Sequence, residues 1–253
     1  MMTNKAFTGL MIRLSLGFVY LSAGLGKLVP AYIGWLIGPP DISQHVDWQW
    51  LIVSYPIIAV YQIITGALIL TQRYSLWGLL ALLPLSIGIL TFTIVAEFRG
   101  TPFLNTFLLG LNLFALWMEK DAIRKLWKRD LGNLSQYGAT ALYPAKLLPH
   151  ISLVLILIAT GWSFFHDSLF LNVLVTAALL LLTINLFQVR DYLWLDKLII
   201  VLFFAICCAT VNRLYLGKMM PEIVYVPFQL IPVGFLLYFL RLIIRAVQNQ
   251  MSA

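Results

Sequence analysis

Residues 13–28 read RLSLGFVYLSAGLGKL and decide the fold, because they place two cations inside an apolar segment. On a helix, one stripe of this segment carries both cations, one aromatic ring and two glycines, at positions i, i+4, i+7, i+11 and i+14. The stripe consists of Arg13, Gly17, Tyr20, Gly24 and Lys27. Cations inside a membrane-spanning segment are costly, so this stripe must face protein or water rather than lipid.

The composition of the 253-residue chain is typical of an integral membrane protein. The chain is 61% hydrophobic and 11% charged, and its mean hydropathy is +0.92, whereas soluble domains are about half apolar and a quarter charged. The apolar runs are too many for a signal peptide with a soluble body, so we expect the first segment to be retained. The sequence lacks the alternating pattern of an outer-membrane barrel. The net charge of +7 indicates membrane topology, and we expect no nucleic-acid partner.

Eight apolar segments predict an all-α fold, a polytopic transmembrane bundle of about eight helices. The segments cover residues 7–28, 51–71, 75–96, 102–118, 150–166, 169–189, 196–214 and 224–244. If both termini are in the cytoplasm, all of the 17 basic residues except four lie on the cytoplasmic side, as the positive-inside rule requires. The exceptions are Lys27, Arg99, Arg213 and Lys218. We therefore expect a multi-pass protein of the bacterial inner membrane.

The chain divides into three predicted parts. Residues 1–118 form a four-helix membrane unit, residues 119–148 a basic cytoplasmic loop with an interfacial amphipathic helix, and residues 149–253 a second four-helix half. A tryptophan-bearing loop, residues 28–50, joins the first two helices on the outer side. Because tryptophan favours the headgroup level, we expect this loop to lie against the outer surface or to be partly re-entrant.

Polar side chains gather toward the outer ends of the first, third and fourth predicted helices. Lys27, Glu97, Arg99 and Asn105 lie at that boundary, and Gln62 and Asn112 lie deeper. Glu97 could pair with Lys27 across the helices, and Gln62 needs a hydrogen-bond partner near the middle of the membrane. Two interpretations remain open: a ligand-binding pocket that opens outward, or interhelical bonds that fix the bundle.

Arg13 and Tyr20 are interpreted as structural polar residues, and no metal site is expected. Fourteen residues at 1.5 Å each place Arg13 about 21 Å from Lys27, so the two cations cannot share a partner. Arg13 either snorkels to the inner interface or pairs with another residue. The three histidines are too far apart in the topology to form a paired-histidine site. Cys207 and Cys208 are adjacent within an apolar run and are interpreted as small buried hydrophobes.

Three stretches of the first half resemble the DoxX-like family of small bacterial membrane proteins. RLSLGFVYLSAGLGKLVP (13–30) resembles the first-helix signature, and YQIITGALILTQRYSLWGLLALLPLSIGI (61–89) is similar to the second helix, turn and third helix. GTPFLNTFLLGLNLFALW (100–117) resembles the fourth helix. The resemblance covers about residues 7–118 and implies a four-helix membrane unit associated with quinone-linked oxidoreductase or redox-stress systems. Where the family often has a glutamate, this chain has Gln62.

These observations predict a membrane subunit or partner of a quinone-linked envelope redox system. We expect it not to be catalytic by itself, to carry no intrinsic cofactor, and to have a quinone as a candidate ligand. Its expected partners are the lipid bilayer and other membrane or envelope proteins. Two alternatives are a carrier that binds a lipid or small anion in the outward-facing polar pocket, and a scaffold or assembly subunit of a larger envelope complex.

Overall fold

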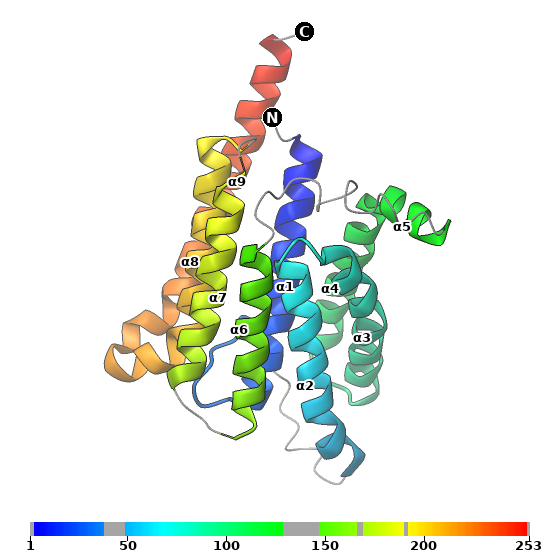
Figure 1. Cartoon of the computed structure of the whole chain (residues 1–253), viewed down its shortest axis with the longest axis vertical. Helices are drawn as coiled ribbons and strands as arrows, with labels where there is room; N and C mark the ends of the chain where they lie inside the picture. The colour runs from blue at the N-terminus through cyan, green and yellow to red at the C-terminus, as the bar shows by residue number, and fades with distance from the viewer. Residues whose placement is uncertain (1–2, 38–48, 129–146, 166–168, 190–191, 252–253) are drawn as a thin grey trace.

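The structure is a bundle of long helices that run up and down along a common direction (Figure 1). The computed structural model describes residues 3–37, 49–128, 147–165, 169–189 and 192–251, and within these ranges it contains helices and no strand. The elements are α1 (Asn4–Leu28), α2 (Gln49–Leu70), α3 (Ser75–Val95), α4 (Thr101–Met118), α5 (Lys120–Trp127), α6 (Leu147–Ser163), α7 (Leu169–Phe187), α8 (Trp194–Met219), the 3₁₀ helix η4 (Pro221–Tyr225) and α9 (Val226–Met251).

The predicted all-α, polytopic membrane bundle is confirmed. Seven helices of the described ranges are long and apolar enough to cross a membrane, and α6, with 17 residues, is a shorter apolar helix. Each of the eight predicted segments coincides for most of its length with one helix, from α1 to α4 and from α6 to α9. The segments 196–214 and 224–244 were predicted to end too early. α8 continues through Gly217 and Lys218 to Met219, and α9 continues through Arg245 to Met251, because hydropathy falls there but helical hydrogen bonding does not stop.

α1 is the central helix, and its apolar side chains belong to two hydrophobic cores. The larger core joins Phe7, Leu14 and Phe18 to residues of α2, α6, α7 and α8. The smaller core joins Leu16 and Val19 to residues of α2, α3 and α4. Because a helix that is apolar on all sides must be covered on all sides, α1 links the predicted first and second halves of the chain.

Glycines let α1 and α2 approach each other closely. A Cβ on Gly66 would lie 2.6 Å from the carbonyl oxygen of Gly17, and a Cβ on Gly24 would lie 2.6 Å from the carbonyl oxygen of Ala59. Small residues at such positions allow backbone-to-backbone packing between membrane helices. The glycines of the stripe therefore form a packing seam against α2.

The segment after α1 turns back into the bundle. Val29 and Ile33 are fully buried, and the Gly34 amide donates a hydrogen bond to the Val211 carbonyl of α8 at 3.0 Å. Asn172 of α7 donates to the Tyr32 carbonyl at 3.1 Å. Of the two expected locations of this loop, the described part therefore takes the partly re-entrant one, because the backbone groups of Tyr32 and Gly34 find partners on α7 and α8. Residues 38–48 of the loop lie outside the described residues.

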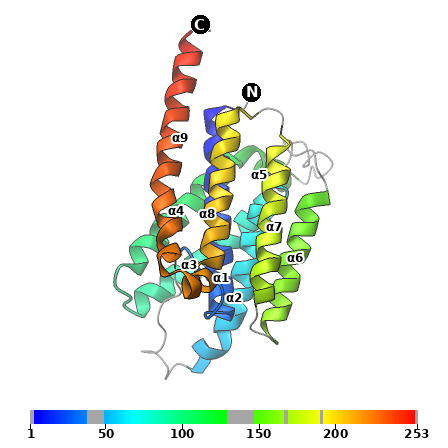
Figure 2. The same cartoon turned by 90° about the vertical axis from the view of Figure 1, so that its left-hand side faces the viewer.

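Both termini lie at the same end of the bundle, as an even number of crossings requires (Figure 1). We call this the Arg13 end, and the opposite end, where α1 stops, the Lys27 end. α5 lies at the Arg13 end and confirms the predicted short helix, with the Trp127 side chain 88% exposed. Residues 129–146 of the predicted basic loop lie outside the described residues. α9 packs along α8 and extends past the other helices at the Arg13 end (Figure 2).

Candidate functional site

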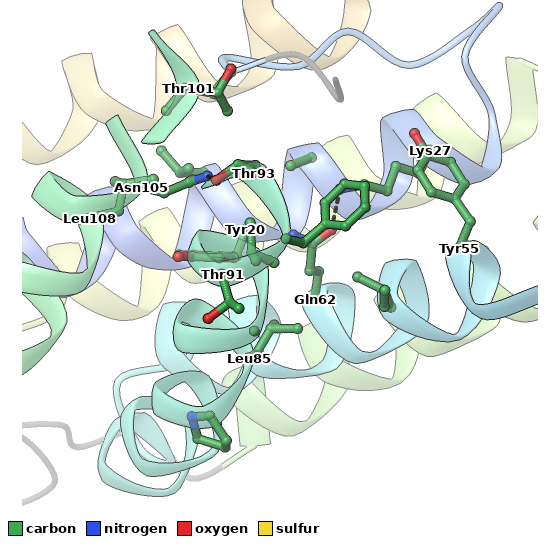
Figure 3. Close-up of a pocket in the computed structure, with 18 of the residues that line it drawn as sticks. Tyr20, Lys27, Tyr55, Gln62, Leu85, Thr91, Thr93, Thr101, Asn105 and Leu108 are labelled. Carbon is green, nitrogen blue, oxygen red and sulfur yellow. Dashed lines mark hydrogen bonds between the residues drawn. The ribbon is translucent and has the colours of Figure 1, made fainter. Parts of the chain in front are cut away.

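A cavity of about 620 Å³ lies between α1, α2, α3 and α4, toward the Lys27 end (Figure 3). We call it the Lys27 cavity. Its wall is mainly apolar, with Val19, Ile58, Leu85 and Leu108 among the lining residues. The volume is typical of small-molecule sites, which span roughly 300–1,000 Å³ and combine an apolar wall with a few placed polar groups.

Lys27 reaches the cavity because α1 packs so closely on α2. Gly24 removes the side chain that would separate the two helices one turn before Lys27. The Lys27 Nζ donates a hydrogen bond to Gln62 Oε1 at 2.6 Å and lies 5.8 Å from the centre of the Tyr55 ring, within the range of a cation–π interaction. Gln62 is 3% exposed, so the partner that its position in the membrane requires is Lys27.

Hydrogen bonds fix the other walls of the cavity. Asn105 of α4 donates from Nδ2 to Thr93 Oγ1 of α3 at 3.2 Å, and Thr93 donates to the Leu90 carbonyl at 3.0 Å. The Tyr20 hydroxyl lies 2.9 Å from Ser86 Oγ and joins α1 to α3. Tyr20 also lines the cavity, so a residue interpreted as structural forms part of the site.

Two of the predicted pocket residues lie elsewhere. Glu97 and Arg99 are exposed in the turn between α3 and α4 and are not among the residues that line the Lys27 cavity. α3 ends at Val95, and Glu97 adopts a left-handed backbone conformation with φ of 53°. The predicted pairing of Glu97 with Lys27 is therefore wrong, because this turn takes Glu97 off the helix and Lys27 donates to Gln62 instead.

Asn112 is fully buried in α4 but does not line the cavity. Neither its side-chain nitrogen nor its oxygen has a hydrogen-bond partner among the described residues. The structure therefore brings together Lys27, Gln62 and Asn105 of the six predicted pocket residues and places Asn112, Glu97 and Arg99 outside the wall.

Arg13 pairs with other residues rather than snorkelling. Its Nε donates to Gln72 Oε1 and its Nη1 to Glu119 Oε1, both at 2.8 Å. Gln72 holds this position in a left-handed backbone conformation, with φ of 57°. Gln72 and Glu119 were not predicted as partners of Arg13, although each follows directly after a predicted helix at the end where Arg13 lies.

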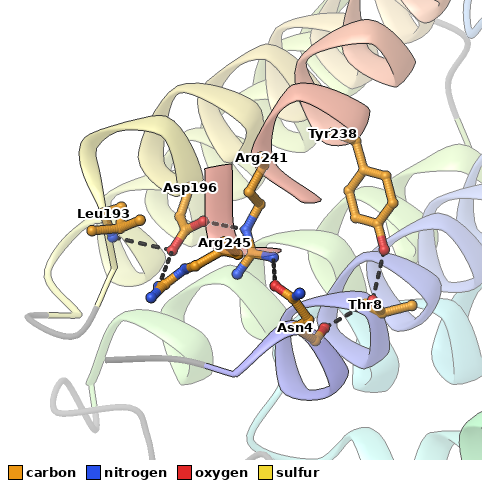
Figure 4. Close-up of polar contacts among 7 residues, drawn as sticks. All are labelled: Asn4, Thr8, Leu193, Asp196, Tyr238, Arg241 and Arg245. Atoms are coloured by element: carbon orange, nitrogen blue, oxygen red, sulfur yellow. Dashed lines mark hydrogen bonds and ion pairs between the residues drawn. The ribbon is translucent and has the colours of Figure 1, made fainter. Parts of the chain in front are cut away.

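A second buried ionic cluster ties α9 to α8 and α1 (Figure 4). Arg241 forms an ion pair with Asp196, and both side chains are fully buried. Arg241 also donates from Nη1 to Asn4 Oδ1 at 2.8 Å, and its guanidinium carbon lies 4.0 Å from the centre of the Phe7 ring. These contacts join residues of α1, α8 and α9, so the cluster is structural. The sequence pattern did not predict that Asp196 and Arg241 are in contact.

The described residues contain no group of three or more histidine, cysteine, aspartate or glutamate side chains that could hold a metal ion. Cys207 and Cys208 are free, with Cys207 buried in the larger core. The chemistry of the Lys27 cavity therefore rests on one primary amine, two side-chain amides and several hydroxyls. These groups donate and accept hydrogen bonds, as a binding site for a polar headgroup requires.

No protein-family model, no curated protein and no solved structure matches this chain. Its function must therefore be inferred from its own residues, and the Lys27 cavity is the feature that points to a ligand.

Proposed function

We propose that this chain is a membrane protein that binds an amphipathic small molecule in the Lys27 cavity. The observation that supports the proposal is the cavity itself. It is large enough for a small molecule, its wall is mainly apolar, and Lys27 contributes one amine to the lining. An apolar ligand body gains about 25 cal/mol for each Å² that it buries in such a wall. The ligand's polar head would accept a hydrogen bond from Lys27, whose ammonium group has three donors.

The rim of the cavity supports entry of the ligand from the bilayer. Val95 lines the cavity and is 65% exposed on α3, and Thr91 and Gly88 are lining residues that are also exposed. In a membrane-spanning bundle, exposed side chains on α3 face lipid. A molecule dissolved in the bilayer could therefore reach the cavity without crossing water.

We place the Arg13 end in the cytoplasm and the Lys27 end on the outer side of a bacterial inner membrane. The positive-inside rule supports this orientation, because the basic helix α5 and the Arg13 end carry most of the lysines and arginines. In this orientation the Lys27 cavity lies in the outer half of the membrane.

Two glycine substitutions give a matched test. Gly88 lines the cavity at its rim, and a Cβ there would meet no atom within 4 Å. Gly110 on α4 has the same open surroundings but is not among the lining residues. We expect Gly88→Trp to narrow the rim and to reduce the amount of bound amphiphile, and Gly110→Trp to leave it unchanged.

The measurement is mass spectrometry of the organic extract from purified protein, expressed per mole of chain. The proposal predicts one enriched amphipathic compound in the wild-type extract, at a level that Gly88→Trp lowers and Gly110→Trp retains. An extract that contains only bulk membrane lipids, in the same proportions for all three proteins, would refute the proposal.

A second candidate function is a membrane subunit or partner of a quinone-linked redox system. The resemblance of residues 7–118 to the DoxX-like family supports it, and a quinone offers carbonyl oxygens that could accept a hydrogen bond from Lys27. If this candidate is correct, the enriched compound is a quinone and an oxidoreductase co-purifies with the chain. Gentle extraction that recovers neither would count against it.

A further inference from the structure

The Lys27 ammonium group has no carboxylate partner among the described residues. Its contacts there are the neutral Gln62 oxygen, at 2.6 Å, and the face of the Tyr55 ring. Lys27 is partly buried, and two fully or nearly fully buried cations differ from it in this respect. Arg13 is paired with Glu119, and Arg241 with Asp196.

An uncompensated cation in this location is costly. A charge in a membrane-spanning helix is tolerated when it pairs with another group or faces water, and removing an ammonium group from water costs several kcal/mol unless another charge compensates it. The hydrogen bond to Gln62 satisfies one of three ammonium protons. The remaining two protons can each be donated to a further acceptor.

We propose that the ligand of the Lys27 cavity is an amphipathic anion whose oxyanion head pairs with Lys27. This inference rests on the proposed binding function and adds the chemical class of the ligand. A carboxylate or phosphate head would supply the counter-charge that no described residue provides to Lys27, and a single apolar chain would lie along the aliphatic wall. A charge-assisted hydrogen bond of this kind is shorter and about twice as strong as a neutral one.

The test compares three probes that share a twelve-carbon chain and differ in the head. Radiolabelled laurate, dodecyl phosphate and dodecanol are titrated against the full chain in phosphatidylcholine nanodiscs, and binding to empty nanodiscs is subtracted. We expect at least one of the two anions to bind about 10-fold or more tightly than dodecanol, since hydrogen bonds to charged groups contribute about 1.5–3 kcal/mol and 1.4 kcal/mol is tenfold in affinity. The tighter anion identifies the head as a carboxylate or a phosphate.

Three variants assign the effect to Lys27. Lys27→Met, which keeps a similar side-chain length, should weaken anion binding about 10- to 100-fold, whereas Lys27→Arg should retain most of it. Lys218→Met is the matched control, because Lys218 is exposed at the same end of the bundle, contacts the Tyr32 ring and does not line the cavity. It removes the same charge and should leave anion binding unchanged.

The outcomes separate this inference from the proposed function. Dodecanol that binds as tightly as both anions to the wild-type chain would overturn the anionic ligand and leave the binding function standing. Equal loss of anion binding in Lys27→Met and Lys218→Met would also overturn it, because the effect would then be general surface charge. If no probe binds saturably and the purified chain carries no enriched amphiphile, the proposed function itself is refuted.

Discussion

A ligand-binding role for Lys27 predicts that removing it together with Gln62 does not destabilise the ligand-free protein. The perturbation is the double variant Lys27→Met/Gln62→Leu, which replaces a partly buried polar pair by two apolar side chains of similar length. The comparison is Arg13→Met, which removes the cation at the other end of the same helix. Arg13 is bound by Glu119 and Gln72, whereas Gln62 supplies the one side-chain oxygen that binds Lys27 within the part of the chain that the structure describes.

The two variants are expected to change the free energy of unfolding differently: Arg13→Met lowers it, and the double variant leaves it unchanged or raises it. Removing Arg13 leaves the Glu119 carboxylate buried without its cation, and breaking a buried ion pair in this way costs about 3–5 kcal/mol. Replacing both members of a buried polar pair by apolar groups of the same shape is nearly neutral or stabilising, and for ion pairs the gain reaches about 1–4 kcal/mol. We therefore expect the double variant to be as stable as the wild type or more stable.

The assay is equilibrium unfolding in mixed micelles by increasing fractions of sodium dodecyl sulfate, followed by far-ultraviolet circular dichroism. The protein is delipidated first so that bound ligand does not add to its stability. A double variant that loses as much free energy of unfolding as Arg13→Met would refute this reasoning. Lys27 would then be a structural residue like Arg13.

Three further variants test the packing of the bundle. Asp196→Asn should lower the free energy of unfolding by about 3–5 kcal/mol, because Asp196 is fully buried with its arginine partner, and the exposed Glu222→Gln should change it little in the same denaturation assay. Gly66→Leu should abolish the monodisperse peak in size-exclusion chromatography, because its Cβ would lie 2.6 Å from a backbone oxygen of α1. The control Gly161→Leu should retain the monodisperse peak, because a Cβ on Gly161 would meet no atom within 4 Å. Gly34→Ala should lower the melting temperature, because its Cβ would overlap the Thr210 carbonyl oxygen of α8. An unchanged melting temperature would contradict the buried position of Gly34.

The helical architecture was predictable because a membrane imposes it locally. An apolar run of about 20 residues predicts a spanning helix from its own residues alone. The glycine spacing of α1 likewise predicts close packing against a neighbouring helix. The deeper position of Gln62 follows from its place near the middle of its helix. These features depend on the sequence within one helix.

The remaining features depend on contacts between distant residues. Arg13 and Glu119 are 106 positions apart, and Asp196 and Arg241 are 45 positions apart, so hydropathy carries no signal for either pair. The wrong position predicted for Glu97 has a different cause, since a helix end with a left-handed residue looks the same in a hydropathy profile as one more helical turn. The inward turn of the segment after α1 likewise depends on partners of Tyr32 and Gly34 on α7 and α8.

The most direct test of the central claim is an electron cryomicroscopy map of the wild-type chain purified from its native membrane. We expect elongated non-protein density in the Lys27 cavity, with its head within hydrogen-bond distance of the Lys27 ammonium group and its body along α2 and α3. A map in which the side chains are resolved and the cavity holds no such density, or in which the head of the bound molecule lies away from Lys27, would contradict it.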